Sequence, residues 1–430
     1  MSAFSIALSG LSAASSDLDV TSNNIANADT IGFKGSRAEF ADLYASGAVN
    51  LNSAITGEGV ELSENAQQFS QGNITTTSSN LDLAISGDGF FTMKDANGVS
   101  YTRNGEFQQN SAGDVVGADG AALQVYPPLA NGGFNTGALS DLNLQTAQSA
   151  PLATSTGSVL INLPAGSAVP TDTTFSPTDS ASYNYSTSTT VYDTLGNSYP
   201  ATMYFVAAST TAGTPPVTTA TPDTWDVYMT VNGTQTSATP QTLTFNNAGA
   251  LTDTNGTAVA TSDGNVAFST GTGDLSDGAE PLNMTLNFSD TTQYGGAFGV
   301  TSITQNGYAT GQLSTVAIDA EGIVSAVYTN GRSTQLGQLA MANFANPQGL
   351  EQLGNTSWAQ TYTSGDVVQG TADSAGFGSI QAGALESSNV DLTTELVNMI
   401  TAQRSFDANA QVITTANQES QTVIQMSQAG

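Results

Sequence analysis

The two ends of the chain carry narrow apolar stripes at helical spacing, and no other feature restricts the fold as strongly. Near the carboxyl terminus, residues 385–425 place apolar side chains at alternating intervals of four and three, the spacing of a coiled-coil seam. The apolar members of this stripe are Leu392, Leu396, Met399, Phe406, Ala410, Ile413 and Ile424. The spacing predicts one long helix, and Asp391 stands where a carboxylate caps the first turn.

A second stripe lies at the amino terminus. Its residues follow the same alternating intervals of four and three: Phe4, Leu8, Leu11, Ser15, Leu18, Ser22 and Ile25. We expect this helix to end near Ala28, because the following Asn-, Asp- and Gly-rich residues accept left-handed backbone angles and compete with helical hydrogen bonds. The two stripes suggest a coiled coil. The commoner alternative is an amphipathic helix lying on a globular domain.

Such narrow stripes bury little surface within one monomer, so we predict that they are buried between copies of the chain. Each Leu moved from water into such packing is worth about 1.5–3 kcal/mol, which offsets the ordering of a helix that is loose in the monomer. A heterologous contact repeated in this way gives an open helical filament. The predicted subunit interface comprises Phe4, Leu8, Leu11, Leu18, Asn23, Asn24, Ile25, Asn27, Gly32, Phe33, Leu392, Leu396, Met399, Phe406 and Ile413.

Between the ends, the sequence predicts a mainly β chain with two nested β-rich domains. Alternating apolar residues and turn signals recur from Leu81 to residue 145 and again over Leu313–Ile318, Ile323–Tyr328 and Leu336–Phe344, so these strands should pair with one another. We expect terminal helices at 1–32 and 385–430, extended arms at 33–76 and 371–384, an inner β domain at 77–145 and 286–370, and an outer insert at 146–285.

The outer insert is rich in Thr, Ser, Gly and Ala, which is also typical of a disordered linker. Its aromatic residues, among them Tyr204, Phe205 and Trp225, favour a packed core instead. The predicted strands of the insert are Val159–Leu163, Tyr183–Tyr192, Met203–Val206, Trp225–Val231 and Leu282–Phe288.

Charge and composition exclude several classes of function. Of 430 residues only 10% are charged, yet the net charge is -30, so we expect neither nucleic acid nor a membrane as partner. No run is long enough for a membrane span. The chain has no Cys and no His, which removes thiolate, imidazole and the usual zinc chemistry. Scattered acids could form a glycosidase pair, but solvated surface is their usual fate.

We therefore expect no enzyme activity, no cofactor, no metal and no small-molecule substrate. The Gly-rich stretch Gly271–Gly278 and the turn at Asp253 have some likeness to calcium-binding loops, and both are read as solvated loops. No basic residue precedes Lys34, so a cleavable secretory signal is not expected at the amino terminus.

The two ends resemble the paired terminal signatures of bacterial flagellar axial proteins, the family of rod, hook and hook–filament junction subunits. The segments are Ser9–Lys34 (SGLSAASSDLDVTSNNIANADTIGFK) and Leu385–Thr415 (LESSNVDLTTELVNMITAQRSFDANAQVITT). Within the family, Asn346–Leu350 (NPQGL), Val191–Pro200 (VYDTLGNSYP) and Tyr294–Phe298 (YGGAF) resemble hook subunits. The resemblance covers residues 1–130 and 290–430.

The resemblance implies a structural subunit that polymerises into a flexible hollow tube and transmits torque from rod to filament. It also implies export through the flagellar type III apparatus without a cleaved signal, an extracellular location, and rod, hook-cap and hook–filament junction proteins as partners. Two alternatives stay open: a distal rod or other axial subunit, and a secreted β-rich adhesin or surface-layer protein, which the Thr- and Ser-rich insert favours.

The charge of the chain leads to a first prediction. The purified chain should stay monomeric in low salt and polymerise in sulfate, because salt screens repulsion beyond about 8–10 Å and sulfate strengthens apolar burial. Sedimentation and electron microscopy measure this. Polymerisation that salt leaves unchanged would refute the prediction.

Overall fold

The computed structural model describes residues 3–43, 57–144, 148–208, 224–259, 263–271, 275 and 278–428, and it divides the chain into two compact units. Unit 1 comprises Met1–Thr146, Ser314–Val327 and Ser333–Gly430, and unit 2 comprises Ala147–Leu313 and Tyr328–Arg332. None of the helices within the described residues is long and apolar enough to cross a membrane. Both chain ends belong to unit 1, although they are the most distant parts of the sequence.

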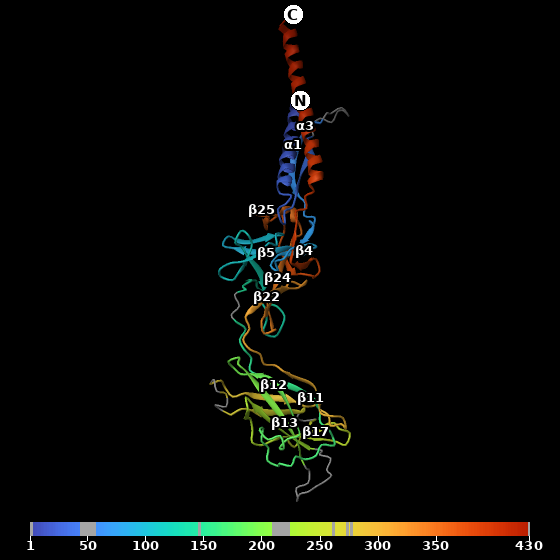
Figure 1. The fold of residues 1–430 in the computed structure, drawn as a ribbon. Coiled ribbons are helices and arrows are strands. Elements are labelled where there is room, and N and C mark those ends of the chain that lie inside the picture. Colours follow the sequence, from blue (N-terminus) through green and yellow to red (C-terminus); the bar gives the residue numbers. More distant parts are fainter. Residues whose placement is uncertain are drawn as a thin grey trace. The chain divides into compact units, whose positions relative to one another are not determined.

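Two helices at the chain ends pack side by side in unit 1 (Figure 1). They are α1 (Ala3–Ala26, 24 residues) and α3 (Leu392–Gln428, 37 residues). The capping prediction for α3 is confirmed, since the Asp391 side chain accepts a hydrogen bond from the Thr394 backbone N–H at 2.7 Å. That bond holds the pKa of Asp391 below its ordinary value. At about 1.5 Å per residue α3 is the longer helix by about 20 Å, and it runs on past the amino terminus (Figure 1).

The largest sheet of unit 1 has 12 strands within the described residues. Its main path runs β22 (Leu313–Ile318), β23 (Ile323–Tyr328), β24 (Ser333–Asn343), β9 (Ala122–Tyr126), β5 (Phe90–Asp95), β6 (Gly98–Thr102), β26 (Ser357–Ala359) and β25 (Glu351–Gly354). The strands β10 (Ser140–Asp141), β27 (Val368–Thr371), β7 (Gln108–Gln109) and β8 (Val115–Val116) join at its sides. As predicted, strands from before and after the insert pair, because β24 bonds to both β9 and β5.

Three two-stranded sheets connect this body of unit 1 to the helices. They are β1 (Ser36–Asp42) with β2 (Val60–Gln67), β3 (Ile74–Thr76) with β29 (Ala384–Glu386), and β4 (Leu83–Ser86) with β28 (Ser379–Ala382). A short 3-10 helix, η1, spans Pro347–Gly349. In two of the sheets the outgoing chain pairs with the returning chain, so the polypeptide leaves and re-enters the helical region as a matched ribbon.

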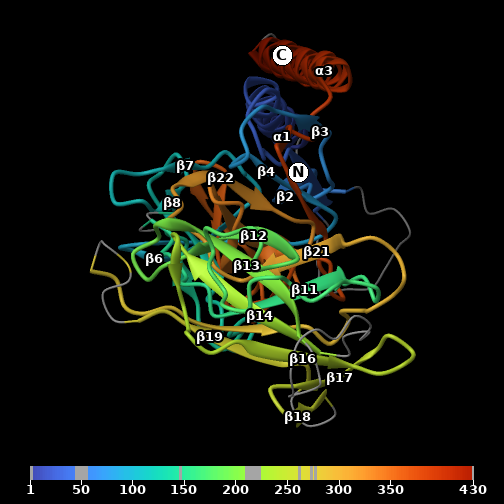
Figure 2. The same ribbon diagram turned by 60° about the horizontal axis from the view of Figure 1, so that its bottom comes forward.

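Within the described residues, unit 2 is built from two sheets that share one core. A four-stranded sheet runs β19 (Asn265–Ser269), β20 (Asn283–Asn287), β11 (Thr156–Asn162) and β21 (Gly299–Gln305). A seven-stranded sheet runs β12 (Tyr185–Tyr192), β13 (Ser198–Ala208), β14 (Thr224–Val231), β16 (Gln241–Phe245), β17 (Leu251–Thr254) and β18 (Thr257–Ala258), with β15 (Thr234–Gln235) on β14. Figure 2 shows β13, β14 and β16 side by side.

The cores of the two units contain different residues. In unit 2, alternate residues of β13 and β14 point inward, and Phe205, Trp225 and Phe288 are fully buried. In unit 1, Leu83, Ile85 and other buried residues form one cluster, and the aromatic residues Phe90, Tyr101, Phe344 and Trp358 form a second. The aromatic residues of the insert thus pack as the sequence indicates, and the linker alternative is wrong for the described part of it.

The sequence places most strands correctly and misses some ends. The predictions for Leu313–Ile318 and Ile323–Tyr328 match β22 and β23 in full. Helix α1 ends at Ala26, two residues before the predicted Ala28, where the backbone hydrogen bonds change to the three-residue spacing of a turn: the Asn27 N–H donates to the Asn24 carbonyl at 3.2 Å and the Ala28 N–H donates to the Ile25 carbonyl at 3.3 Å. Much of the Gly-rich stretch Gly271–Gly278 lies outside the described residues, and no metal-binding cluster of acids is found within them.

The separate cores lead to a second prediction. Phe205→Ala should destabilise unit 2 by about 3–5 kcal/mol, because it empties a fully buried position. The two tryptophans report on different units, since Trp225 lies in unit 2 and Trp358 in unit 1. During urea denaturation, the fluorescence of a protein that carries Trp358→Phe reports the unfolding of unit 2 through Trp225. The fluorescence of a protein that carries Trp225→Phe reports the unfolding of unit 1 through Trp358. Only the Trp225 transition should move to lower urea.

The control for this experiment is Leu195→Ala, which removes an exposed side chain of unit 2 and should move neither transition. Equal shifts of both transitions in Phe205→Ala would mean that the two units unfold together, and the prediction would be wrong.

Candidate functional site

The face that α1 buries consists mainly of small side chains. Ala7, Ala14 and Thr21 are buried at intervals of seven residues, and Ala402 is buried on α3. Gly10 lies directly against α3, because a Cβ atom there would lie 2.8 Å from the Asn409 side-chain oxygen. Small residues allow two helix backbones to come close together, so this contact depends on shape rather than on large apolar area.

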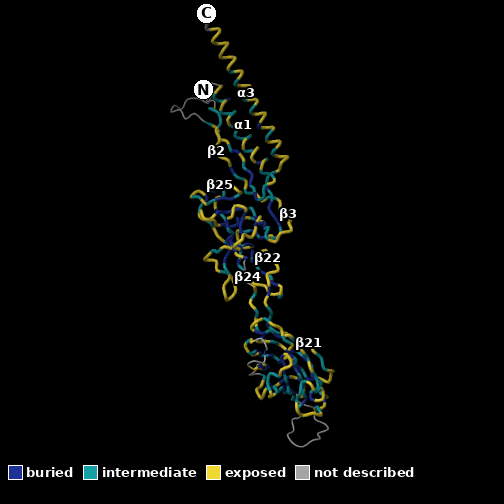
Figure 3. The backbone as a smooth tube through the Cα atoms, turned by 60° about the vertical axis from the view of Figure 1, so that its left-hand side comes forward, coloured by how far each residue is buried: buried dark blue, intermediate teal, exposed yellow. Residues whose placement is uncertain are grey.

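The large apolar residues of the predicted stripes divide into two groups. Leu11, Leu18, Ile25, Met399, Phe406 and Ile413 are half-buried. Phe4, Leu8, Leu392 and Leu396 are 40–50% exposed, as is Ile400, four residues beyond Leu396. Figure 3 shows exposed and half-buried residues along most of α3, while buried residues gather in the β cores. The large apolar side chains thus face solvent beside the tight helix contact.

The residues at the exit of α1 are held by side-chain hydrogen bonds. Asn24 is buried and bonds to Ser36 in both directions: its Nδ2 donates to the Ser36 carbonyl at 2.7 Å, and its Oδ1 accepts from the Ser36 N–H at 2.9 Å. Asn23 is exposed and accepts from Asn27 Nδ2 at 3.0 Å. The side-chain amide of Asn24 thereby links α1 to β1, because it pairs with both backbone groups of Ser36 as a neighbouring strand residue would.

Gly32 and Phe33 turn the chain toward the body of unit 1. Gly32 has φ +68°, and a Cβ there would come within 2.6 Å of the Asn104 backbone N, so no larger residue fits without strain. Its N–H donates to the Glu386 carbonyl at 2.8 Å. Phe33 is half-buried and lines a pocket described below. The turn therefore places Lys34 directly against the returning chain.

A buried charge cluster joins the two chain ends. Lys34 Nζ lies 2.6 Å from Glu386 Oε1, and Arg103 lies 3.2 Å from Glu386 Oε2, with all three side chains at most 4% exposed. Backbone groups complete the site: the Ser70 carbonyl accepts from Lys34 at 2.9 Å, and the Gly72 N–H donates to Glu386 at 2.8 Å. The Lys34–Glu386 ion pair thus joins residues that are 352 positions apart.

The electrostatics of this cluster are finely opposed. Burial lowers the pKa of Lys34 and of Arg103, and the negative charge of Glu386 opposes both shifts. The Arg103 guanidinium also lies over the Phe90 ring at 5.5 Å, a favourable cation–π position. Among the described residues, Arg103 Nε has no hydrogen-bond partner. Removing Glu386 would leave two buried cations without their counter-ion.

Asn389 makes a second connection between the ends. Its Oδ1 accepts from the Gly35 N–H at 2.8 Å, and its Nδ2 donates to the Gln68 carbonyl at 2.6 Å. One amide therefore links the chain after α1, the chain after β2 and the chain before α3.

Four structural residues of this site were not predicted from the sequence: Lys34, Arg103, Glu386 and Asn389. One signal was available: with six basic residues in 430, a Lys within the Gly-rich run after α1 is unusual, and a rare cation often has a fixed partner. The identity of that partner could not be read, because 36 acids are present.

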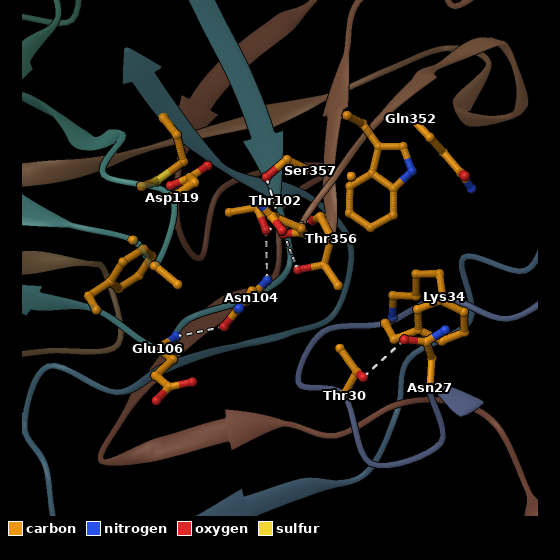
Figure 4. Close-up of a pocket in the computed structure, with 18 of the residues that line it drawn as sticks. Asn27, Thr30, Lys34, Thr102, Asn104, Glu106, Asp119, Gln352, Thr356 and Ser357 are labelled. Carbon is orange, nitrogen blue, oxygen red and sulfur yellow. Dashed lines mark hydrogen bonds between the residues drawn. The ribbon is translucent and has the colours of Figure 1, made fainter. Parts of the chain in front are cut away.

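A pocket of about 450 Å³ opens beside this cluster in unit 1 (Figure 4). Met93, Phe107 and Trp358 supply apolar wall, while Glu106 and Asp119 supply carboxylates. Its rim is braced by short hydrogen bonds, such as that from Thr102 Oγ1 to the Thr356 carbonyl at 2.7 Å. Neither carboxylate takes part in an ion pair of the described residues, so the pocket offers acceptors and apolar surface together.

Four family models match parts of this chain. They are "Flagella basal body rod protein" over residues 4–34, "Flagellar hook protein FlgE/F/G D1 domain" over 84–174, "Flagellar basal body protein FlaE D2 domain" over 162–308 and "Flagellar basal body rod FlgEFG protein C-terminal" over 381–426.

Similar proteins span its full length. The flagellar hook protein FlgE of Escherichia coli K12 is 38% identical over 431 residues, which cover 99% of this chain and 100% of that protein. The flagellar hook protein FlgE of Rhizobium meliloti is 32% identical, covering 96% of this chain and 95% of that protein. The crystal structure of Helicobacter pylori flagellar hook protein FlgE2 matches with a TM-score of 0.52 at 14% identity, over 73% of this chain and 100% of that chain.

The buried cluster gives a third prediction. Glu386→Gln should destabilise the protein by about 3–5 kcal/mol, because it leaves buried cations unpaired. The matched control is Glu39→Gln: Glu39 also lies 2.6 Å from its partner, Arg37, but their side chains are 40% and 68% exposed. The control should cost about 1 kcal/mol or less. Urea denaturation measures both.

The same variant has a defined pH dependence. The pKa of Lys34 in the folded protein lies below its ordinary value of 10.5, so between those two values the unfolded state binds more protons and stability rises with pH. Loss of the Glu386 charge lowers the folded pKa further and widens this window. The stability deficit of Glu386→Gln should therefore shrink as the pH rises toward 10.5, the ordinary pKa of Lys. A deficit that is constant or grows would contradict this account.

Proposed function

We propose, from the premise that this chain belongs to the bacterial flagellar hook protein family, that its copies form a flexible, hollow helical tube that transmits torque as a universal joint between rod and filament. The chain is a structural subunit of the hook, a part of the flagellum outside the cell. Its described relatives are structural hook proteins rather than enzymes. The flexibility, the hollow interior and the torque are our proposal.

The observation that supports this proposal most is the exposure of large apolar side chains on both terminal helices. Phe4 and Leu8 on α1, and Leu392, Leu396 and Ile400 on α3, are 40–50% exposed. Each set is spaced by four residues, so its members lie in one row along a helix. Because the buried contact between α1 and α3 uses small residues, these rows are free to pack against other copies.

We propose that the subunit interface comprises these rows together with the residues predicted from the sequence. The half-buried members of the set would line the groove between each exposed row and the other terminal helix of the same copy. They are Leu11, Leu18, Met399, Phe406 and Ile413. Asn24, Gly32 and Phe33 would act by fixing the direction in which the helices leave the body.

The proposed division of labour follows the two units rather than the domain bounds predicted from the sequence. The helices α1 and α3 would polymerise, the rest of unit 1 would carry the load, and unit 2 (147–313 and 328–332) would face away from the assembly core. The proposed partners are rod, hook-cap and hook–filament junction proteins and the export apparatus, which would pass the chain without cleaving a signal.

Leu396→Asp gives the fourth prediction. A carboxylate in the exposed apolar row should block polymerisation, because burying an unpaired charge between copies is costly. The β units should keep their fold, which circular dichroism and urea denaturation measure, while sedimentation and electron microscopy measure assembly.

Thr401→Asp is the matched control, since it adds the same charge to an exposed residue of α3 about 140° around the helix. This variant should still assemble. Tubes formed by Leu396→Asp at the wild-type concentration would show that the row has no role in assembly.

A further inference from the structure

Tyr362 is the most exposed large hydrophobic side chain among the described residues. It is 102% exposed, and the next, Met426, is 67% exposed. The residue lies in unit 1 between β26 and β27. Its ring thus makes no protective contact with its own chain, although tyrosine is among the residues that contribute most when buried in protein interfaces.

The backbone around Tyr362 is held rigidly by its neighbours. Thr361 and Ser364 bond to each other across the turn: the Thr361 N–H donates to Ser364 Oγ at 3.0 Å, and the Ser364 N–H donates to Thr361 Oγ1 at 3.2 Å. The Thr361 and Thr363 hydroxyls both donate to the Gly349 carbonyl. Ser364 is fully buried beneath the turn.

The other side of the turn is also fixed. Asn346 Nδ2 donates to the Thr363 carbonyl at 3.0 Å, and the Asn346 N–H donates to the Ser364 carbonyl at 3.2 Å. A Cβ on Gly349 would lie 2.5 Å from the Ser364 N, so the two segments are in the closest possible contact. A turn held in this way loses little backbone freedom when the side chain that it presents binds a partner.

The pocket of unit 1 has the properties needed to receive this ring. Its volume of about 450 Å³ lies within the range of protein ligand sites. Phe33, which is half-buried, and Ala118, which is exposed, offer apolar contact, and the exposed carboxylates of Glu106 and Asp119 can accept a phenol hydroxyl. A hydrogen bond from a phenol to a carboxylate is charge-assisted and so stronger than a neutral one.

We propose that Tyr362 of one copy inserts into this pocket of a second copy. The pocket is continuous with the exit of α1, because Asn27 and Phe33 line it and both belong to the proposed assembly interface. Since knob and pocket are different patches of one chain, the contact leaves a free pocket on one copy and a free tyrosine on the other. Repetition gives an open helical array. This inference rests on the proposed function.

The energetic test replaces the ring without touching the fold. Tyr362→Ala should raise the concentration needed for polymerisation in sulfate about tenfold or more, as expected of an interface anchor. Tyr362→Phe keeps the apolar contact and loses the hydroxyl, so its effect should be smaller. The matched control is Leu195→Ala, another exposed apolar residue, 56% exposed and in unit 2, which should polymerise like the wild type. Unfolding in urea should be unchanged in all three.

The contact itself is tested by cross-linking, which the absence of cysteine makes selective. Gln360→Cys places a thiol beside Tyr362, and Ala118→Cys places one at the pocket, where Ala118 is exposed. Polymers mixed from the two single-cysteine chains and treated with a short bismaleimide should give a cross-linked heterodimer. Polymers mixed from Gln360→Cys and Leu195→Cys should not, and neither should the monomers in low salt.

The outcomes separate this inference from the proposed function. If wild-type chains polymerise, and Tyr362→Ala does so at the same concentration or the 360–118 cross-link fails to form, the Tyr362 contact is wrong and the hook assembly stands. If wild-type chains do not polymerise under any salt condition, the proposed self-assembly is wrong as well.

Discussion

The arrangement of unit 1 depends on one carboxylate, that of Glu386. It accepts from Lys34, from Arg103 and from the Gly72 backbone, and so fixes the chain after α1, the strand before α3 and the adjoining sheet at one point. A buried ion cluster of this kind is a weak source of net stability, because desolvation offsets most of its attraction. Its effect here is on geometry: the pairing of Glu386 with both cations fixes the chain that follows the end of α1 and the chain that precedes the start of α3.

The two helices next to this point, α1 and α3, bury small residues and leave large apolar residues exposed. The buried residues of α1 and α3 are small, among them Ala7, Ala14 and Ala402, and Gly10 lies against Asn409, while Leu8, Leu392 and Leu396 stay exposed. A coiled-coil seam within one chain would do the opposite and bury its largest residues. The pair is therefore a thin element whose main apolar area remains available to other copies.

The sequence predicts much of this fold because its signals are local. Strand ends such as Leu313–Ile318 follow from alternation and turns, and the cap at Asp391 follows from its position before the seam. The face of α1 that packs on α3 could not be predicted, since periodicity favours large apolar residues and the close contact depends on small ones. The Lys34–Glu386–Arg103 cluster was missed because it joins residues hundreds of positions apart, and nothing local to Glu386 separates it from the other acids.

The sequence separation of that cluster also affects how the chain can fold. Lys34 and Glu386 are 352 positions apart, so the entropy of closing this loop is lost before the contact forms, and contacts of such long range form late. The β units between them can fold first from their own local hairpins. A chain cut short before residue 386 keeps Lys34 and Arg103 but has no counter-ion for them, so the base of the helices stays unformed. The last residues to emerge thus decide whether the first ones can become ordered, and only complete chains present both helices in register.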